Sequence, residues 1–342
     1  MTLIEKCNST LDDHCFFRFR PYNALTCKEL LYNEMFFYSK NEVNDPFDLS
    51  ANLIIPKGKS KVIEYFIESA FKGTRSKNGY NLFADDYKVV KHLASILSTK
   101  TNNISDLLDI SIYELFNKAF EEYKITDISF PLFWKYFSRV FLNLQPNNLH
   151  GVSFAKNYRN MLLWSIYADK HEGFCEIFQL KNDTISLRNI TSETYNDYDI
   201  KNVEYKNNKD IDLSLMFNDD GEMDLSLLFQ KYLPVVTEKA YLTKSNEWGN
   251  EQEFRIFENT SVQFSTIDEQ KEDNSLQNKL YYFNEEQLLG VIVGANMKKN
   301  HIEEIKWILE NKKTRKMIYQ SIPKGNQVEV VINNIYSGKN VS

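Results

Sequence analysis

Charged side chains alternate with apolar ones in two short segments, and this spacing is the first sign of chemistry. Arg18 and Arg20 are two residues apart in FFRFR, and Glu251, Glu253 and Arg255 are two apart in EQEFR. Side chains two apart on a β-strand share one face, so each segment predicts a row of charges. Paired guanidiniums suit a phosphate or carboxylate, and paired carboxylates predict one catalytic and one positioning group. The structural alternatives are solvated surface arginines and an edge strand with cross-strand ion pairs.

A strand–helix–strand stretch, residues 151–178, holds a second set of candidates. Ser153 falls in its first strand, while Trp164 and Tyr167 are three residues apart on the helix and therefore share a face. The two rings predict either a stacking wall for the ring of a ligand or ordinary core packing. Because the chain has no GxSxG elbow, Ser153 is not expected to be an acyl-transfer nucleophile.

Asn44 and Asp45 belong to the sequence NDPFD, which Asp48 ends. Asn-Asp-Pro is a strong turn former, and an Asp side chain can close such a turn. A structural loop is therefore the favoured interpretation, and a polar contact with a ligand is the alternative. A metal site would need further carboxylates from elsewhere, and no second compact acidic cluster supplies them, so no metal is predicted.

Composition limits the class of protein. The 342 residues are 42% hydrophobic and 14% aromatic, which is enough for a substantial core. The formal charge of -6 comes from interspersed charges, which disfavours an extended nucleic-acid surface without excluding a local patch. Four cysteines without CxxC spacing predict neither a zinc site nor a disulfide framework. Since neither a signal peptide nor a membrane-spanning apolar run is apparent, we expect a cytoplasmic protein with no membrane partner.

The order of the apolar patterns predicts an α+β fold with mixed, largely antiparallel sheets. Helical patterns fill residues 60–145. We interpret this segment as an insertion within a single domain, 1–342. The insertion would serve as a lid, a surface for a partner protein or a buttress. Strands are expected at 16–20, 35–39, 152–155, 174–180, 185–190, 200–206, 253–258, 289–294, 316–320 and 327–333. Further helices are expected at 26–33, 160–169, 223–233 and 301–312, and loops at 207–222 and 260–280.

Five motifs, taken in order, resemble those of an uncharacterised bacterial family, domain of unknown function 2971. The motifs are FRFR, NDPFD, SFxxxYxNxLLWSxYAxxHxGFCxxF, KxxxWxxExEFR and VIVGANxxxxxIEEI. The resemblance covers nearly the whole chain, with a divergent helical middle. Many members have a histidine after Trp-Ser, where this chain has Ile166, so a mechanism through a histidine at that position is not expected.

A weaker similarity, in the order of key residues, points to the Arg-Ser-Glu type of ADP-ribosyltransferases. That order is a basic residue on the first strand, a serine on a middle strand and Glu-x-Glu on a late strand. Here it corresponds to Arg18 or Arg20, then Ser153, then Glu251 and Glu253. The Ser-Thr-Ser run common in that group is reduced to Ser153 alone. The similarity implies an ADP-ribosyltransferase-like core and NAD as the substrate.

The same similarity implies roles for individual residues. Glu253 would stabilise an oxocarbenium-like ribose, Glu251 would lie near the acceptor, and Ser153 would brace the ribose or the catalytic carboxylate. Contacts with the nucleotide would come from Arg18, Arg20, Trp164, Tyr167, Arg255, Asn44 and Asp45. A macromolecular acceptor, protein or nucleic acid, and a role as a toxin or anti-phage effector are implied as well. The alternatives are a metal-dependent nuclease and a non-catalytic module that binds a nucleotide or a protein.

Overall fold

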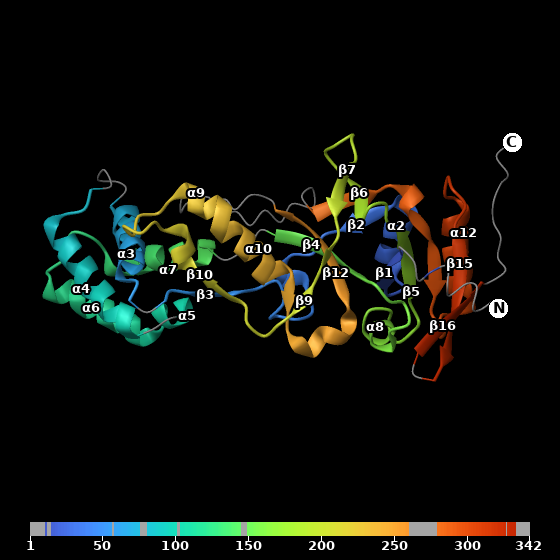
Figure 1. Cartoon of the computed structure of the whole chain (residues 1–342), viewed down its shortest axis with the longest axis horizontal. Helices are drawn as coiled ribbons and strands as arrows, with labels where there is room; N and C mark the ends of the chain where they lie inside the picture. Colours follow the sequence, from blue (N-terminus) through green and yellow to red (C-terminus); the bar gives the residue numbers. More distant parts are fainter. Residues whose placement is uncertain are drawn as a thin grey trace.

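The protein is elongated, with helices gathered at one end and a large sheet at the other (Figure 1). We describe it from a computed structural model that covers residue 11 and residues 15–56, 58–75, 81–100, 103–144, 149–259, 279–325 and 327–332. The predicted α+β class with mixed, largely antiparallel sheets is confirmed.

An eight-stranded sheet forms the centre of the sheet half. Its strand order is β16-β15-β14-β5-β1-β4-β12-β8. Neighbours are antiparallel except β14 and β15, which are parallel and joined through helix α12 (Lys299–Glu310). The strands are β1 (Cys15–Arg20), β4 (Leu149–Ala155), β5 (Phe174–Gln179), β8 (Lys201–Asn202), β12 (Glu253–Asn259), β14 (Leu288–Val293), β15 (Met317–Lys324) and β16 (Gln327–Ile332).

Both faces of this sheet are covered, because alternate residues of its strands enter two separate cores. On β1, Phe16 packs in one core and Phe17 in the other. The first core also takes side chains from α2 (Ala24–Tyr32), from α12 and from a four-stranded sheet; the second takes Trp164 of α8 (Met161–Ile166). The smaller sheet has the order β2 (Glu34–Phe36), β13 (Leu280–Phe283), β6 (Thr184–Asn189) and β7 (Asn196–Asp199).

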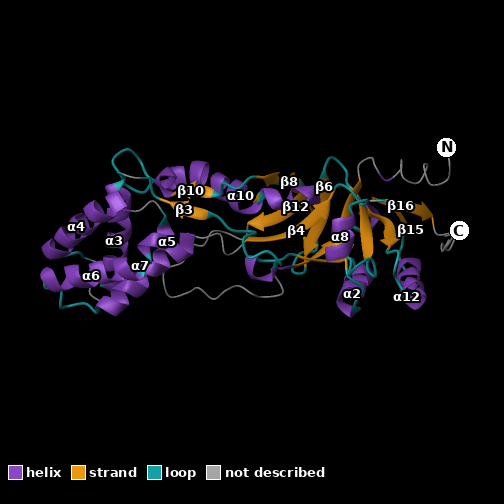
Figure 2. Ribbon diagram, turned by 90° about the horizontal axis from the view of Figure 1, so that it is seen from below, coloured by secondary structure: helices purple, strands orange, loops and turns teal. Residues whose placement is uncertain are grey.

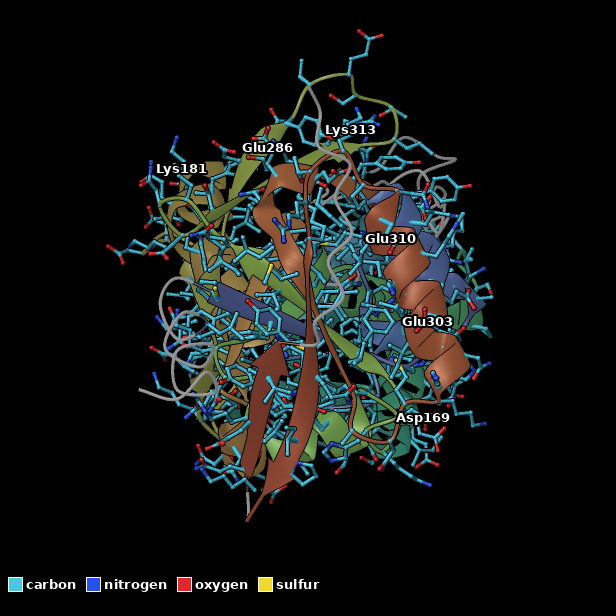
Figure 3. All side chains as sticks on the ribbon, turned by 90° about the vertical axis from the view of Figure 1, so that its right-hand side faces the viewer. Asp169, Lys181, Glu286, Glu303, Glu310 and Lys313 are labelled. Atoms are coloured by element: carbon cyan, nitrogen blue, oxygen red, sulfur yellow. The ribbon has the colours of Figure 1, made fainter. Side chains whose placement is uncertain are left out.

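Helices α2 and α12 lie on the same side of the large sheet (Figure 2). Ile305, Ile308 and Leu309 of α12 are buried in the first core. Glu303 and Glu310 are exposed on the opposite side of the helix, facing away from the sheet (Figure 3). This division of apolar and charged positions is what a surface helix with one buried stripe requires.

The helical half has a third core of its own. Its apolar stripes at helical spacing, such as Val62, Ile63 and Phe66, pack there as the sequence predicts. The helices are α3 (Ser60–Thr74), α4 (Ala84–Lys100), α5 (Ile104–Leu107), α6 (Ile110–Glu122) and α7 (Phe130–Leu144). Buried Arg75 is bound there by Asp86 and Asp127. That residues 60–145 are an insertion, and that they serve as a lid, a surface for a partner protein or a buttress, stays a prediction.

Several short elements connect the two halves. Strands β3 (Asn52–Ile54) and β10 (Asp210–Asp212) pair in parallel, as do β9 (Glu204–Tyr205) and β11 (Thr243–Lys244). Helix α9 (Leu225–Leu227) continues through a π-helical turn (Leu228–Tyr232) into α10 (Leu233–Tyr241). Single 3₁₀ turns cover Lys40–Glu42, Leu213–Met216, Asn246–Glu251 and Glu285–Gln287.

These connecting elements account for the main errors in the predicted boundaries. The loop predicted at 207–222 contains β10 and a 3₁₀ turn, and the helix predicted at 223–233 runs on to Tyr241. The strand predicted at 200–206 divides into β8 and β9, which pair with different partners. Such short pairings depend on distant partners, which local apolar patterns do not reveal. Most of the loop predicted at 260–280 lies outside the described residues.

None of the described helices combines the length and the apolar character needed to cross a membrane.

Candidate functional site

A cavity of about 510 Å³ lies where strands β1 and β4 separate. Among the described residues these strands pair at Phe17 and Ala155 alone, and farther along β4 the backbone of Gly151 pairs with that of Tyr38. The volume falls in the range of small-molecule sites, roughly 300–1,000 Å³. Its polar lining comes from Arg18, Arg20, Asn23, Thr26, Tyr38, Glu42, Asn44, Asp48, Ser153, Tyr167, Asp169, Lys244, Glu251 and Glu253.

One side of the cavity is an arginine cluster, which we define as Arg18, Arg20, Glu29, Tyr38 and Glu176. Arg18 is opposite Glu176 on β5, and its Nη1 is 3.4 Å from the Glu176 carboxylate and 3.6 Å from that of Glu29. Arg20 binds Glu29 through Nη2 and donates from Nη1 to the Tyr38 hydroxyl at 2.9 Å. Both arginines are buried, so they are not the solvated surface residues of the structural alternative.

The arginine cluster contains hydrogen-bond donors that are not used within it. Nη2 of Arg18 and Nε of Arg20 are buried and have no hydrogen-bond partner among the described residues. Glu176 is 1% exposed, and burial raises its pKa despite the two nearby guanidiniums. The two guanidiniums of the arginine cluster therefore keep donors that an anionic ligand could accept from.

The other side of the cavity is a carboxylate cluster, which we define as Asp48, Lys244, Glu251, Glu253 and Arg255. The Arg255 guanidinium donates to both oxygens of Asp48, at 2.9 and 2.6 Å, and to both oxygens of Glu253, at 2.6 and 2.9 Å. Lys244 Nζ lies 2.6 Å from Glu251, 3.3 Å from Glu253 and 3.5 Å from Asp48. Three carboxylates therefore share two cations in a buried site.

The environment separates the pKa values of these carboxylates. Burial alone would raise the pKa of Asp48, but Arg255 and Lys244 lower it to about 2. The same two cations outweigh burial at Glu253 and hold its pKa below the usual range. At Glu251 burial dominates and raises the pKa. Carboxyl groups whose environments push their pKa values apart are typical of acid–base assignments in enzymes.

Glu251 is also held by an aromatic side chain. The Tyr167 hydroxyl donates to its Oε1 at 2.8 Å, and the Asn44 amide lies 3.4 Å from that hydroxyl. Burial, followed by the charge of Glu251, raises the pKa of Tyr167, so the phenol stays a donor. Lys244 Nζ also lies over the Trp248 ring, 4.9 Å from its centroid, which is a cation–π contact.

The backbone explains how Glu251 reaches the same cluster as Glu253. Glu251 ends a 3₁₀ turn, and Gln252 follows with φ of 49°, in the left-handed region. Strand β12 begins only at Glu253, so Glu253 and Arg255 share a strand face as predicted, whereas Glu251 arrives through the turn.

The cavity brings together most of the residues that the sequence predicts. Arg18, Arg20, Ser153, Glu251 and Glu253 all line it. Tyr167 and Asn44 line it too. Ser153 is exposed and lies opposite Arg255 across the β4–β12 pair.

Three predicted contacts lie elsewhere. Trp164 is fully buried in a core, where its indole N–H donates to the carbonyl of Tyr158. Asp45 accepts from the backbone N–H of Phe47, as the turn-closing interpretation expects. Arg255 lies behind the lining and holds Glu253 and Asp48.

Sequence reasoning missed four members of the two clusters, Glu29, Tyr38, Lys244 and Glu176, and named Asp48 only as part of the NDPFD turn. A usable signal existed for Glu176, which stands alone as a charge in the apolar strand FCEIF. No group of three or more His, Cys, Asp or Glu side chains suited to a metal ion is found within the described ranges.

Fold and site together define an α+β protein with a small-molecule-sized cavity between an arginine cluster and a carboxylate cluster. Residues 163–256 match the model of a family described as "Protein of unknown function (DUF2971)". This stretch includes α8 from Leu163 onwards, Lys244 and the Glu251–Arg255 segment, and over it the family resemblance is confirmed. No curated protein and no solved structure matches the chain.

Proposed function

We propose that the protein is an enzyme that breaks the N-glycosidic bond of NAD, as an ADP-ribosyltransferase or an NAD glycohydrolase. The observation that carries the proposal is that Arg18, Arg20, Ser153, Glu251 and Glu253 line one cavity. Those residues come from three strands and a turn far apart in the sequence, and they fit the Arg-Ser-Glu order.

The chemistry follows from the charges. Breaking the bond between C1′ and the pyridinium nitrogen sends the electron pair to that nitrogen and leaves positive charge on the ribose. Glu253, kept ionised by Arg255, would stabilise this charge more strongly than the ground state. The Arg18 and Arg20 guanidiniums would bind the phosphate group.

An acceptor oxygen or nitrogen must then bond to C1′ and lose a proton. Glu251 is suited to take this proton, because burial raises the pKa of its carboxyl and so makes the carboxylate a stronger base. Lys244 and Tyr167 fix the orientation of Glu251 through its two oxygens. Water as the acceptor would give hydrolysis; a protein or nucleic acid would give a transferase, which is the activity a toxin or anti-phage effector would use.

Nicotinamide release from NAD tests the proposal. We expect release by the wild type and a loss of at least about 100-fold in Glu253→Gln, since removal of one charge-stabilising group typically has an effect of this size. Glu258→Gln is the matched control: it makes the same substitution on β12, and Glu258 does not line the cavity. Melting temperatures separate catalysis from stability, because Glu253 also binds Arg255. Wild-type protein that binds NAD without releasing nicotinamide would contradict the proposal.

One observation favours a second function, that of a non-catalytic binding module. Every carboxylate of the carboxylate cluster already pairs with Lys244 or Arg255, as in a purely structural ion network. Tight binding of a nucleotide with no turnover would support this reading. A metal-dependent nuclease, the remaining alternative, would lose its activity in EDTA.

A further inference from the structure

Among the described residues that line the cavity, only Arg18 and Arg20 have cationic hydrogen-bond donors that no other residue uses. Its basic lining residues are Arg18, Arg20 and Lys244. Lys244 donates to Glu251 and Glu253 and lies 3.5 Å from Asp48, so three carboxylates already neutralise its charge. Nη2 of Arg18 and Nε of Arg20 find no hydrogen-bond partner in the part of the chain that the structure describes.

The two donor groups belong to residues two apart on β1 that both line the cavity, and two donors on one strand face suit one tetrahedral anion. A pyrophosphate carries two such groups, and the only other cation in the described lining, Lys244, is already surrounded by three carboxylates. The arginine cluster holds two guanidiniums against two carboxyls, one of them the fully buried Glu176. The charges of the cluster are therefore nearly balanced, and what it offers an anion is the two unpartnered donors, enough for a single phosphate.

The opposite side of the cavity favours positive charge. The carboxylate cluster has three carboxylates and two cations, and two of the carboxylates, Glu251 and Glu253, line the cavity. A ligand that is cationic near this cluster and anionic near the arginines would complement both.

We propose that the cavity recognises only the half of a nicotinamide dinucleotide that carries the cationic ring, one ribose and one phosphate, and leaves the adenylate half outside. The identity of the ring rests on the proposed function, whereas the requirement for one cationic and one anionic end rests on the two clusters.

Four ligands test this proposal on the full chain by calorimetry: nicotinamide mononucleotide, its reduced form, nicotinamide riboside and NAD. The mononucleotide and NAD should bind with Kd values within about threefold of each other. The reduced form, which lacks the ring charge, and the riboside, which lacks the phosphate, should bind at least about tenfold more weakly, the range expected for a charge-assisted bond.

Arg18→Gln should bring the affinity for the mononucleotide down to that for the riboside and leave the riboside unchanged. Arg188→Gln is the control, because Arg188 lies outside the cavity against Tyr282. Equal binding of oxidised and reduced forms, or NAD binding more than about tenfold tighter than the mononucleotide, would overturn the inference. The expected affinities without nicotinamide release would refute only the proposed reaction, and release without these affinities would refute only the inference.

Discussion

At the residue scale, Arg255 does most to organise the site without lining it. One planar guanidinium pairs with Asp48 and Glu253 on two sides and also donates to the carbonyl of Tyr241 at 2.9 Å. Lysine has no such fork, so a lysine at this position would leave part of the network unpaired. Burial would lower the pKa of Arg255, but the two carboxylates raise it.

Asp48 gives a pH dependence of stability whose sign follows from its pKa. That pKa is about 2 in the folded protein, against about 3.9 in an unfolded chain. The stabilisation is therefore complete above about pH 4 and is lost as the pH falls through about 2. Asp48→Asn should cost about 3 kcal/mol at pH 7 and much less near pH 2, as measured by urea unfolding at each pH.

Asp85→Asn is the control for that experiment, because Asp85 is an exposed residue of α4 whose neutralisation should change stability by less than about 0.5 kcal/mol. A penalty for Asp48→Asn that does not shrink in acid would show that packing, rather than charge, accounts for the role of Asp48.

At the element scale, the junction between the 3₁₀ turn and β12 decides where Glu251 lies. Gln252 adopts a left-handed conformation there, which is costly for a residue with a Cβ and is found where surrounding structure imposes it. The bend is fixed on the other side by Asn160, which caps α8 and donates to the carbonyl of Asn250 at 2.5 Å.

Gln252→Gly should raise the free energy of unfolding by up to about 1 kcal/mol, because glycine adopts positive φ without steric cost. The same substitution at Gln179, in the extended strand β5, should instead lower it by roughly 0.5–1 kcal/mol. Thermal unfolding of both variants measures the pair. Two variants that change stability in the same direction would contradict the assignment of strain to Gln252.

Elements also show what the sequence could predict. Two-residue alternation placed Arg18 with Arg20 and Glu253 with Arg255 correctly, since a strand imposes that geometry locally. Asp48 pairs with Arg255 across 207 positions of sequence, and no local pattern contains that contact. Trp164 looked equally suited to stacking on a ligand and to core packing, because helical spacing fixes a face but not what covers it.

At the scale of the whole molecule, the carboxylate cluster lies where the two halves meet. Leu49 and Tyr241 pack in the core of the helical half, while Arg255 extends from the sheet. Asp48 precedes Leu49 directly, so the Arg255–Asp48 pair joins one half to the other.

Arg255→Gln should uncouple the halves and give two calorimetric unfolding transitions where the wild type gives one. The physical reason is that it removes a buried ion pair and the bond to the Tyr241 carbonyl together. Arg75→Gln disrupts an ion pair within the helical half alone and should lower the wild-type transition without dividing it. A single transition in Arg255→Gln would mean that apolar contacts suffice to couple the halves.

Among the described residues β1 and β4 pair only at Phe17 and Ala155, so the backbone pairing of the large sheet is nearly interrupted between these two strands. On either side of this interruption the strands pair along their length, β1 with β5 and β4 with β12. A molecule bound between β1 and β4, in contact with Arg18 of β1 and Glu253 of β12, would connect the two parts of the sheet where backbone hydrogen bonds are nearly absent. The sheet would then be more rigid when the cavity holds a ligand than when it is empty.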